Sequence, residues 1–133
     1  MKSETLTVSA VIPAEPRAIY KAWLNGKEHT AMTGSAAKVS AKEGGKYTAW
    51  DGYISGVTLE LEPDKRIVQS WRSTDFAEDA PDSRLEVILT AAKGGTKVTL
   101  KHSELPSGSK EQYRKGWIDF YFSPMKKYFA GLR

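Results

Sequence analysis

Few residues of this chain have the types and spacing that catalysis or metal binding requires. The 133 residues include two histidines, His29 and His102, and no cysteine, which excludes disulfides, thiolate catalysis and cysteine metal sites. The histidines have neither His-x-x-x-His nor Glu-x-x-His spacing, so we expect no metal and no cofactor. No glycine-rich segment has the lysine spacing of a phosphate-binding loop, and no nucleophile-elbow sequence occurs. We therefore predict no catalytic residue and do not expect an enzyme.

Aromatic and amide side chains are the better candidates, and they favour ligand binding. Alternation along the predicted strands directs Tyr47, Gln69, Trp71 and His102 to one face of a sheet. A mostly apolar concavity with a few polar groups is typical of a small-molecule site. We predict a cavity between this face and the last helix, with its mouth near Lys27–Gly34. Its predicted lining is Tyr47, Gln69, Trp71, His102, Trp117, Tyr121 and Met125.

Several of these assignments have alternatives that the sequence leaves open. Large rings such as Trp71 and Trp117 could fill the core and leave no cavity. An inward Gln69 favours the cavity, because a buried amide needs partners or water. For His102 we favour a hydrogen-bonded histidine at a strand end over an acid–base group, since no carboxylate pattern lies near it. His29 lies in a polar helical segment and is expected to be solvated.

The element that must carry much of this lining is a helix predicted over residues 110–130. Ser109 and Gln112 have the spacing of a capping box, and Gly131 is placed for a left-handed C-cap. Pro124 removes one hydrogen bond and should kink the helix by pushing on the carbonyl of Phe120. At 3.6 residues per turn, one face collects Tyr113, Trp117, Phe120, Tyr121, Pro124, Met125 and Tyr128.

Before this helix, the apolar residues follow the period of strands. A first strand at 4–12 and a pair of short helices precede Gly34. Strands are then predicted at 36–41, 46–50, 53–61, 66–72, 83–91 and 96–102. Asp51-Gly52 indicates a two-residue hairpin, after which Val57, Leu59 and Leu61 share a face. The acidic segment 74–82 is expected to be a mobile loop, with Arg72 beside it solvated rather than paired.

These elements predict one α+β domain over residues 1–133. Tight hairpins make the sheet antiparallel, and only the aromatic helix can cover its inner face. We therefore predict a strongly curved antiparallel sheet of six to seven strands wrapped around the long C-terminal helix, with a short helical pair after the first strand.

Composition narrows the class of protein further. The chain is 40% hydrophobic and 27% charged, which is ordinary for a globular protein. The net charge of +4 comes from basic residues scattered among acids, which favours solubility over nucleic-acid binding. No run of ~18 apolar residues and no charged-then-apolar leader occurs, so we expect no membrane span, no signal peptide and a cytoplasmic protein.

Motifs spread over nearly the whole chain occur in an order that resembles a known family. They are Gly44-Gly45-Lys46-Tyr47, Asp51-Gly52, Gly56, Pro63, Arg66-Ile67-Val68, Trp71-Arg72, Gly95-Thr96, Leu105-Pro106, Gly116-Trp117, Tyr121-Phe122 and Lys126–Phe129. This order resembles the activator of heat-shock-protein-90 ATPase homologues, within the START-like (SRPBCC), helix-grip superfamily, and in particular the C-terminal domain of the eukaryotic co-chaperone. The resemblance implies a helix-grip fold and a heat-shock-90-type chaperone as partner. The co-chaperone's separate N-terminal domain, which carries the chaperone-stimulating motif, is missing from this sequence, so we expect little stimulation of the ATPase.

Three functions from different classes follow from the sequence. We favour a START-like protein that binds a small apolar or amphipathic ligand. The first alternative is a protein-interaction or co-chaperone domain that contacts a heat-shock-90-type chaperone. The second is a cyclase- or hydrolase-like enzyme on the same scaffold, which would need a polar pair such as His102 with Tyr47 or Tyr121.

Overall fold

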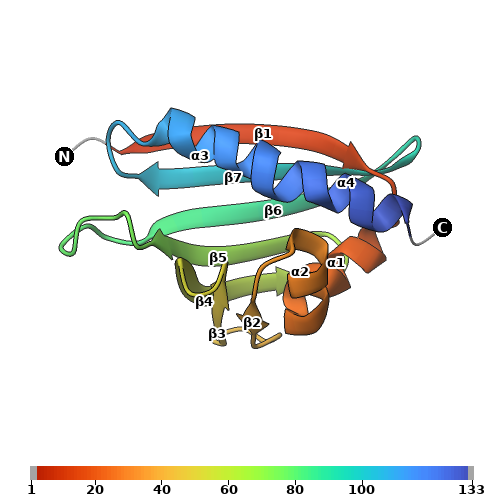
Figure 1. Cartoon of the computed structure of the whole chain (residues 1–133), viewed down its shortest axis with the longest axis horizontal. Coiled ribbons are helices and arrows are strands. Elements are labelled where there is room, and N and C mark those ends of the chain that lie inside the picture. The colour runs from red at the N-terminus through yellow and green to blue at the C-terminus, as the bar shows by residue number, and fades with distance from the viewer. Residues whose placement is uncertain (1–2, 132–133) are drawn as a thin grey trace.

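The chain begins with a strand and two short helices, continues as a run of strands and ends in a long helix (Figure 1). The computed structural model describes residues 3–131. The first three elements are β1 (Glu4–Ile12), α1 (Pro16–Leu24) and α2 (Gly26–Thr33). The following strands are β2 (Lys38–Val39), β3 (Lys46–Ala49), β4 (Ile54–Glu62), β5 (Arg66–Ser73), β6 (Ser83–Ala92) and β7 (Gly95–Leu105). The last helix consists of α3 (Lys110–Trp117), the π-helical turn η1 (Ile118–Phe122) and α4 (Ser123–Ala130).

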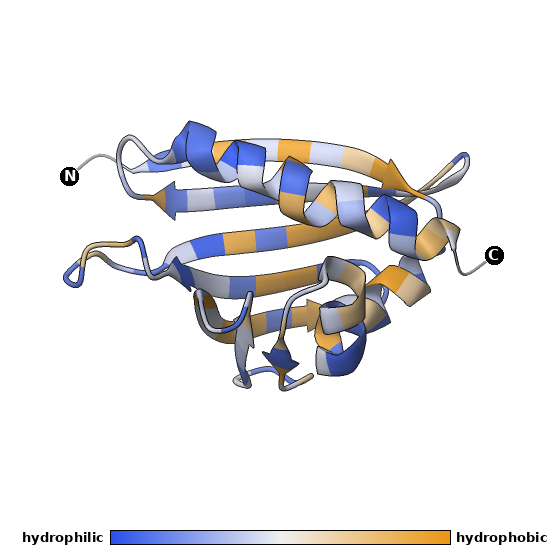
Figure 2. Cartoon of the chain, in the orientation of Figure 1, coloured by the Kyte–Doolittle hydropathy of each residue, from blue (hydrophilic) through white to orange (hydrophobic). Residues whose placement is uncertain are grey.

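All seven strands form one antiparallel sheet in the order β1-β7-β6-β5-β4-β3-β2. The long helix crosses one face of this sheet, and α1 and α2 cover one end of that face (Figure 1). Hydrophobic and hydrophilic bands alternate along β6 (Figure 2), where Leu85, Val87 and Leu89 point into the core. Such alternation is expected of a sheet with one solvated face and one covered face. The predicted fold, an antiparallel sheet wrapped around a long C-terminal helix, is confirmed.

Strand β4 departs from a regular strand at two residues. A Cβ on Gly56 would lie 2.0 Å from the carbonyl oxygen of Ser70, so only glycine allows β4 to approach β5 this closely. Leu59 is then the extra residue of a β-bulge, because Thr58 pairs with Gln69 and Glu60 with Val68. The bulge reverses the alternation: Thr58 is buried and Leu59 is 46% exposed. Leu61, beyond the bulge, packs against the core, so the prediction that Val57, Leu59 and Leu61 share a face is wrong.

The turn between β3 and β4 is longer than the predicted two-residue hairpin. Ala49 pairs with Ile54, so four residues form the loop. Trp50 and Asp51 have φ angles of 52° and 55°, a left-handed conformation that is uncommon for residues with side chains. Trp50 nevertheless packs its ring against Phe120 and Tyr121 of the long helix. The loop thus reverses the chain between β3 and β4 and also places an aromatic ring against the long helix.

The long helix keeps its predicted span but differs in its end contacts. Ser109 Oγ donates to the carbonyl of Pro106 instead of capping the helix, and Gly131 has a φ of −72°, so both predicted caps are wrong. The first amide, that of Lys110, is instead satisfied by the carboxylate of Glu4 at 2.9 Å. Strand β1 therefore supplies the contact that a local cap would otherwise provide.

A π turn occurs directly before Pro124, where the sequence predicts a kink of the helix. The amide of Ser123 bonds to the carbonyl of Ile118, five residues back, directly before Pro124. Because Pro124 has no amide hydrogen, a wider turn is the local alternative to a broken one. The extra residue changes which side chains face inward: Phe122 and Phe129 are buried, whereas Phe120 is 56% exposed. The predicted inward position of Phe120 is therefore wrong.

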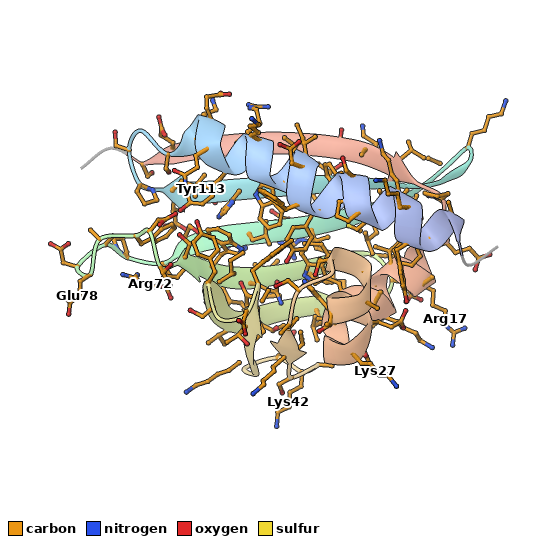
Figure 3. All side chains as sticks on the ribbon, in the orientation of Figure 1. Arg17, Lys27, Lys42, Arg72, Glu78 and Tyr113 are labelled. Atoms are coloured by element: carbon orange, nitrogen blue, oxygen red, sulfur yellow. The ribbon has the colours of Figure 1, made fainter. Side chains whose placement is uncertain are left out.

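Arg72 holds the acidic loop 74–82 to the end of β5. Its guanidinium donates to the carbonyls of Ala77, Glu78 and Ala80 and pairs with Asp82 at 3.0 Å. Figure 3 shows Arg72 near the base of the loop and Glu78 near its tip. The loop is irregular, as predicted, but the prediction that Arg72 stays solvated is wrong, because four backbone and side-chain acceptors surround it.

Candidate functional site

Aromatic rings from four elements meet beneath the long helix. Trp23 of α1 lies 6.4 Å from Trp117 and 5.1 Å from Tyr121, measured between ring centroids. Trp71 of β5 lies 5.8 Å from Trp117. Ring pairs at these separations add about 0.5–1.5 kcal/mol each beyond the burial of their area. The predicted lining residues are all buried here, namely Tyr47, Gln69, Trp71, His102, Trp117, Tyr121 and Met125.

His102 belongs to a chain of hydrogen bonds within this cluster. The indole N–H of Trp117 donates to its Nδ1 at 3.1 Å, so the ring hydrogen must be on Nε2. Nε2 then donates to Ser83 Oγ at 2.8 Å, and that hydroxyl donates to the carbonyl of Trp71 at 2.7 Å. Burial lowers the pKa of His102 to about 3, so the imidazole is neutral.

This arrangement does not activate a nucleophile. For Ser83 to attack, its hydroxyl would have to donate to the imidazole, whereas Nε2 carries the hydrogen and donates. The polar pairs that the enzyme alternative required are also not formed: Tyr47 donates to the carbonyl of Ser70 and Tyr121 bonds to His29. His102 is thus the hydrogen-bonded strand histidine that the sequence favoured.

His29 is buried, and the prediction of a solvated side chain is wrong. Its Nδ1 donates to the carbonyl of Trp23 at 2.9 Å, so its Nε2 accepts from the hydroxyl of Tyr121 at 2.8 Å. Burial lowers the pKa of His29 and raises that of Tyr121. The sequence did not indicate this burial, because most residues of 26–33 are polar, and only one side of α2, with His29, Met32 and Thr33, is buried. The contact joins α1, α2 and η1.

Gln69 has its partners within the core and does not require a cavity. Its carbonyl oxygen accepts from the indole of Trp23, and its amide donates to Thr58 Oγ1, both at 3.2 Å. The β4 bulge that turns Thr58 inward supplies the second partner. The argument that an inward amide favours a void is therefore not supported by this residue.

A cavity of about 350 Å³ nevertheless lies between the long helix and the β3–β4 loop. Its mouth is bordered by exposed Phe120 and Gln112, and no residue of 27–34 lines it, so the predicted mouth is wrong. Three predicted residues contribute: Trp71, Trp117 and Tyr121. Tyr47, Gln69, His102 and Met125 lie deeper in the core and do not line it. The residues that sequence reasoning missed are Trp50, Tyr53, Ile54, Gln112, Tyr113, Gly116 and Phe120.

Gly116 leaves space in the helical wall of this cavity. A Cβ built on it would meet only Phe120 Cδ2, at 4.0 Å. Glycine in the middle of a helix costs about 0.5–1 kcal/mol relative to alanine. Neither a positive φ nor a close backbone contact accounts for glycine here. The residue does, however, leave this part of the cavity wall without a side chain.

One end of the cavity carries polar groups. Tyr113 reaches beneath α3 to the sheet (Figure 3), where its hydroxyl lies 2.6 Å from Ser73 Oγ. The hydroxyl of Tyr53 and the amide of Gln112 both donate to the carboxylate of Asp75. Burial and this hydrogen bond raise the pKa of Tyr53 to about 12, so it remains a donor at neutral pH. The cavity is therefore amphipathic, with aromatic walls and a hydrogen-bonded rim.

Neither a metal site nor a membrane helix occurs in the part of the chain that the structure describes. Among residues 3–131, histidine and carboxylate side chains form no group of three that could hold a metal ion. Within the same residues, no helix is long and apolar enough to cross a membrane.

A curved antiparallel sheet that grips one long C-terminal helix defines the START-like, helix-grip class of proteins. The sequence model described as "Activator of Hsp90 ATPase homolog 1-like protein" matches residues 13–130. The chain belongs to this family.

Individual relatives agree with this assignment. The human "Activator of 90 kDa heat shock protein ATPase homolog 1" is 27% identical over 125 residues, which are 94% of this chain and 37% of that protein. The Dictyostelium discoideum homologue is 26% identical over 115 residues, 86% of this chain and 30% of that protein. The chain thus spans about a third of the length of these relatives.

Solved structures show the shared fold. An HSP90 activator from Plasmodium falciparum superposes with a TM-score of 0.86 at 23% identity, covering 95% of this chain and 96% of that one. A protein from Mesorhizobium loti has a TM-score of 0.82 at 18% identity, covering 98% and 99%.

Proposed function

We propose that the chain binds a small apolar or amphipathic molecule in the cavity between the β3–β4 loop and the long helix. The observation that carries the proposal is Gly116, where the helix lacks a side chain although a Cβ would fit. A cavity of about 350 Å³ is at the small end of ligand sites, which span roughly 300–1,000 Å³. Its walls are mainly aromatic faces, which favour a flat ligand.

Filling the cavity from Gly116 tests this function. N-phenyl-1-naphthylamine, an apolar fluorescent probe, should bind the parent chain, quench its tryptophans and raise its melting temperature by mass action. Gly116→Leu places a side chain in the cavity and should abolish all three responses. The matched control is Lys115→Leu, which adds the same side chain at an exposed neighbouring position. Equal probe binding by Gly116→Leu and the parent would contradict the proposal.

A second proposal, contact with a heat-shock-90-type chaperone, is favoured by the names of the relatives. Both the human and the Plasmodium relatives are described as activators of this chaperone. Because the chain spans 37% of the human relative, the whole activity of that protein is not carried over. We expect the 133 residues alone to bind the chaperone and to stimulate its ATPase little.

Calorimetry and an ATPase assay with purified chaperone test this second proposal. A measurable heat of binding with less than about twofold stimulation is the expected result. Several-fold stimulation would contradict the expected weak activity, and no binding at all would contradict the contact. Gly116→Leu should bind the chaperone like the parent, which separates this function from occupation of the cavity.

A further inference from the structure

We infer that the ligand of this cavity carries a positively charged nitrogen, held at the mouth by Asp75 while its apolar body lies among the aromatic rings. The inference rests on the proposed ligand-binding function and adds the chemical class of the ligand. Three observations carry it: the charge of the segments beside the cavity, the composition of its lining and the contacts of Asp75.

Two loops are acidic in a chain that is basic overall: the β3–β4 loop, which lines the cavity, and the loop 74–82, whose Asp75 bonds to two lining residues. The whole sequence has 20 basic and 16 acidic residues. The loops 50–53 and 74–82 together contain five acids, Asp51, Asp75, Glu78, Asp79 and Asp82, and neither lysine nor arginine. The side chain of Arg72 neutralises part of this charge by pairing with Asp82. Among the remaining carboxylates, that of Asp75 is bonded to two lining residues, and a negative charge at this position raises the local concentration of cations.

The lining itself has no group that would balance an anion. None of its ten residues is lysine, arginine or histidine. A carboxylate or phosphate placed inside would lose its hydration without a cationic partner, which is costly. A cation, in contrast, is attracted to the faces of tryptophan, tyrosine and phenylalanine within ≈ 6 Å of the ring centroid. Trp50, Trp117 and Phe120 contribute rings of this kind to the lining.

Asp75 does not line the cavity itself but is hydrogen-bonded to two residues that do. Its Oδ2 accepts from the hydroxyl of Tyr53 and from the amide of Gln112, and both donors line the cavity. These contacts orient the carboxylate at the rim, and its other oxygen has no hydrogen bond from a side chain among the described residues. An ammonium group at the mouth could bind that oxygen while its apolar part stays inside.

Three probes with one aromatic body and different charges test the inference. They are 2-naphthylmethylamine, which is cationic, 2-naphthalenemethanol, which is neutral, and 2-naphthoate, which is anionic. Dissociation constants come from tryptophan quenching at low salt. We expect the amine to bind roughly three- to fivefold more tightly than the alcohol, as for one partly exposed ion pair, and the naphthoate to bind most weakly.

Two variants identify the carboxylate. Asp75→Asn should remove most of the preference for the amine and leave the affinity for the alcohol unchanged. Asp79→Asn makes the same charge change in the same loop without a contact to the lining, and should preserve most of the preference. An equal or greater affinity for naphthoate than for the amine, or an unchanged preference in Asp75→Asn, would overturn the inference.

The outcomes separate this inference from the proposed function. If the alcohol binds and Gly116→Leu prevents it, but the amine has no advantage, only the charge assignment is wrong. If none of the three probes binds to the parent chain, both the charge assignment and the ligand-binding function are overturned.

Discussion

His102 shows how a single buried side chain fixes chemistry at the residue scale. Both ring nitrogens are bonded, Nδ1 as acceptor from Trp117 and Nε2 as donor to Ser83. An imidazolium would carry a hydrogen on Nδ1 and would therefore lose the bond from Trp117. The hydrogen-bond geometry and the burial thus both favour the neutral ring. Protonation of His102 at low pH should therefore destabilise the folded chain.

The free energy of unfolding should fall as the pH drops from about 6.5 towards 3. The folded-state pKa of His102 is lowered to about 3 from 6.5, so between these values the unfolded chain binds a proton that the folded chain does not. Stability therefore rises with pH across this window, by an amount on the order of a few kcal/mol. His29, whose pKa is also lowered, acts in the same direction.

Nitrogen NMR and unfolding curves check this expectation. The imidazole nitrogens of His102 should keep the shifts of a neutral ring with its hydrogen on Nε2 down to pH 5. If the variant His102→Asn folds, its stability should depend less on pH than that of the parent. Imidazolium shifts in the folded chain at pH 5 would contradict the assignment.

Trp117 is the second residue whose removal has a predictable cost. It is 3% exposed, touches Trp23, Trp71 and Tyr121 and donates to His102. Truncation to alanine should cost about 3–5 kcal/mol of unfolding free energy, because it leaves a cavity and an unpaired Nδ1. Urea unfolding measures the loss. Ile118→Ala, at the adjacent exposed position, is the control and should change stability by about 0.5 kcal/mol or less.

At the scale of elements, the π turn decides which aromatic residues the long helix buries. Tyr113, Trp117, Tyr121, Met125 and Phe129 recur every four residues and are all buried. Four residues of a regular α-helix turn by about 40° more than a full circle, so this row would drift away from the sheet. The wider turn at η1 compensates part of that drift.

Two phenylalanines in this turn give a direct test. Phe122→Ala should cost about 3–5 kcal/mol of unfolding free energy, as expected for a buried phenylalanine. Phe120→Ala, two positions earlier and 56% exposed, should cost about 1 kcal/mol or less. A regular α-helix would place Phe120 inward, so a larger loss at Phe120 than at Phe122 would contradict the π turn. Chemical denaturation of both variants makes the comparison.

Local sequence patterns predicted the helices and strands well but did not predict the irregularities within them. Strand alternation and the aromatic stripe were sufficient for the order of elements, the antiparallel sheet and the span of the last helix. The bulge at Leu59 and the π turn each add one residue to a regular period. Pro124 indicates that the helix is disturbed but not that a π turn forms, and no local pattern marks the bulge. Glu4 could not be recognised as the partner of the Lys110 amide, because 106 positions separate them.

The candidate site was predicted only in part for the same reason. Trp71, Trp117 and Tyr121 follow from regular alternation and line the cavity. Trp50 and Gln112 do not, because the first lies in an irregular loop and the second on the polar side of the helix. Gly116 carried a signal that could have been used, since glycine inside a helix has a cost that requires an explanation.

At the scale of the whole molecule, the four tryptophans report on four different elements of the fold. Trp23 lies in α1, Trp50 in the β3–β4 loop, Trp71 in β5 and Trp117 in α3. Strand β1 pairs with β7, so the first and last strands also depend on each other. Elements that share one core unfold together when no part can keep its buried surface alone.

We therefore predict a single cooperative transition, as one domain requires. Tryptophan fluorescence and far-ultraviolet circular dichroism should give coincident unfolding curves in urea. The variant Trp50→Phe, which removes the reporter in the loop, should leave the midpoint of the dichroism curve within about 0.3 M of the parent value. Two separated transitions would contradict the single domain.

The π turn also determines where the long helix tolerates a change in length. Deleting one residue from α3 or α4 would rotate the remainder of that helix by about 100° and turn its buried side chains towards solvent. Deleting Asp119, an exposed residue inside η1, would instead convert the wide turn into an ordinary one and leave the faces of both flanking halves in place. A loss of one codon should therefore be tolerated among the exposed residues 118–120 and be severe in α3 and α4.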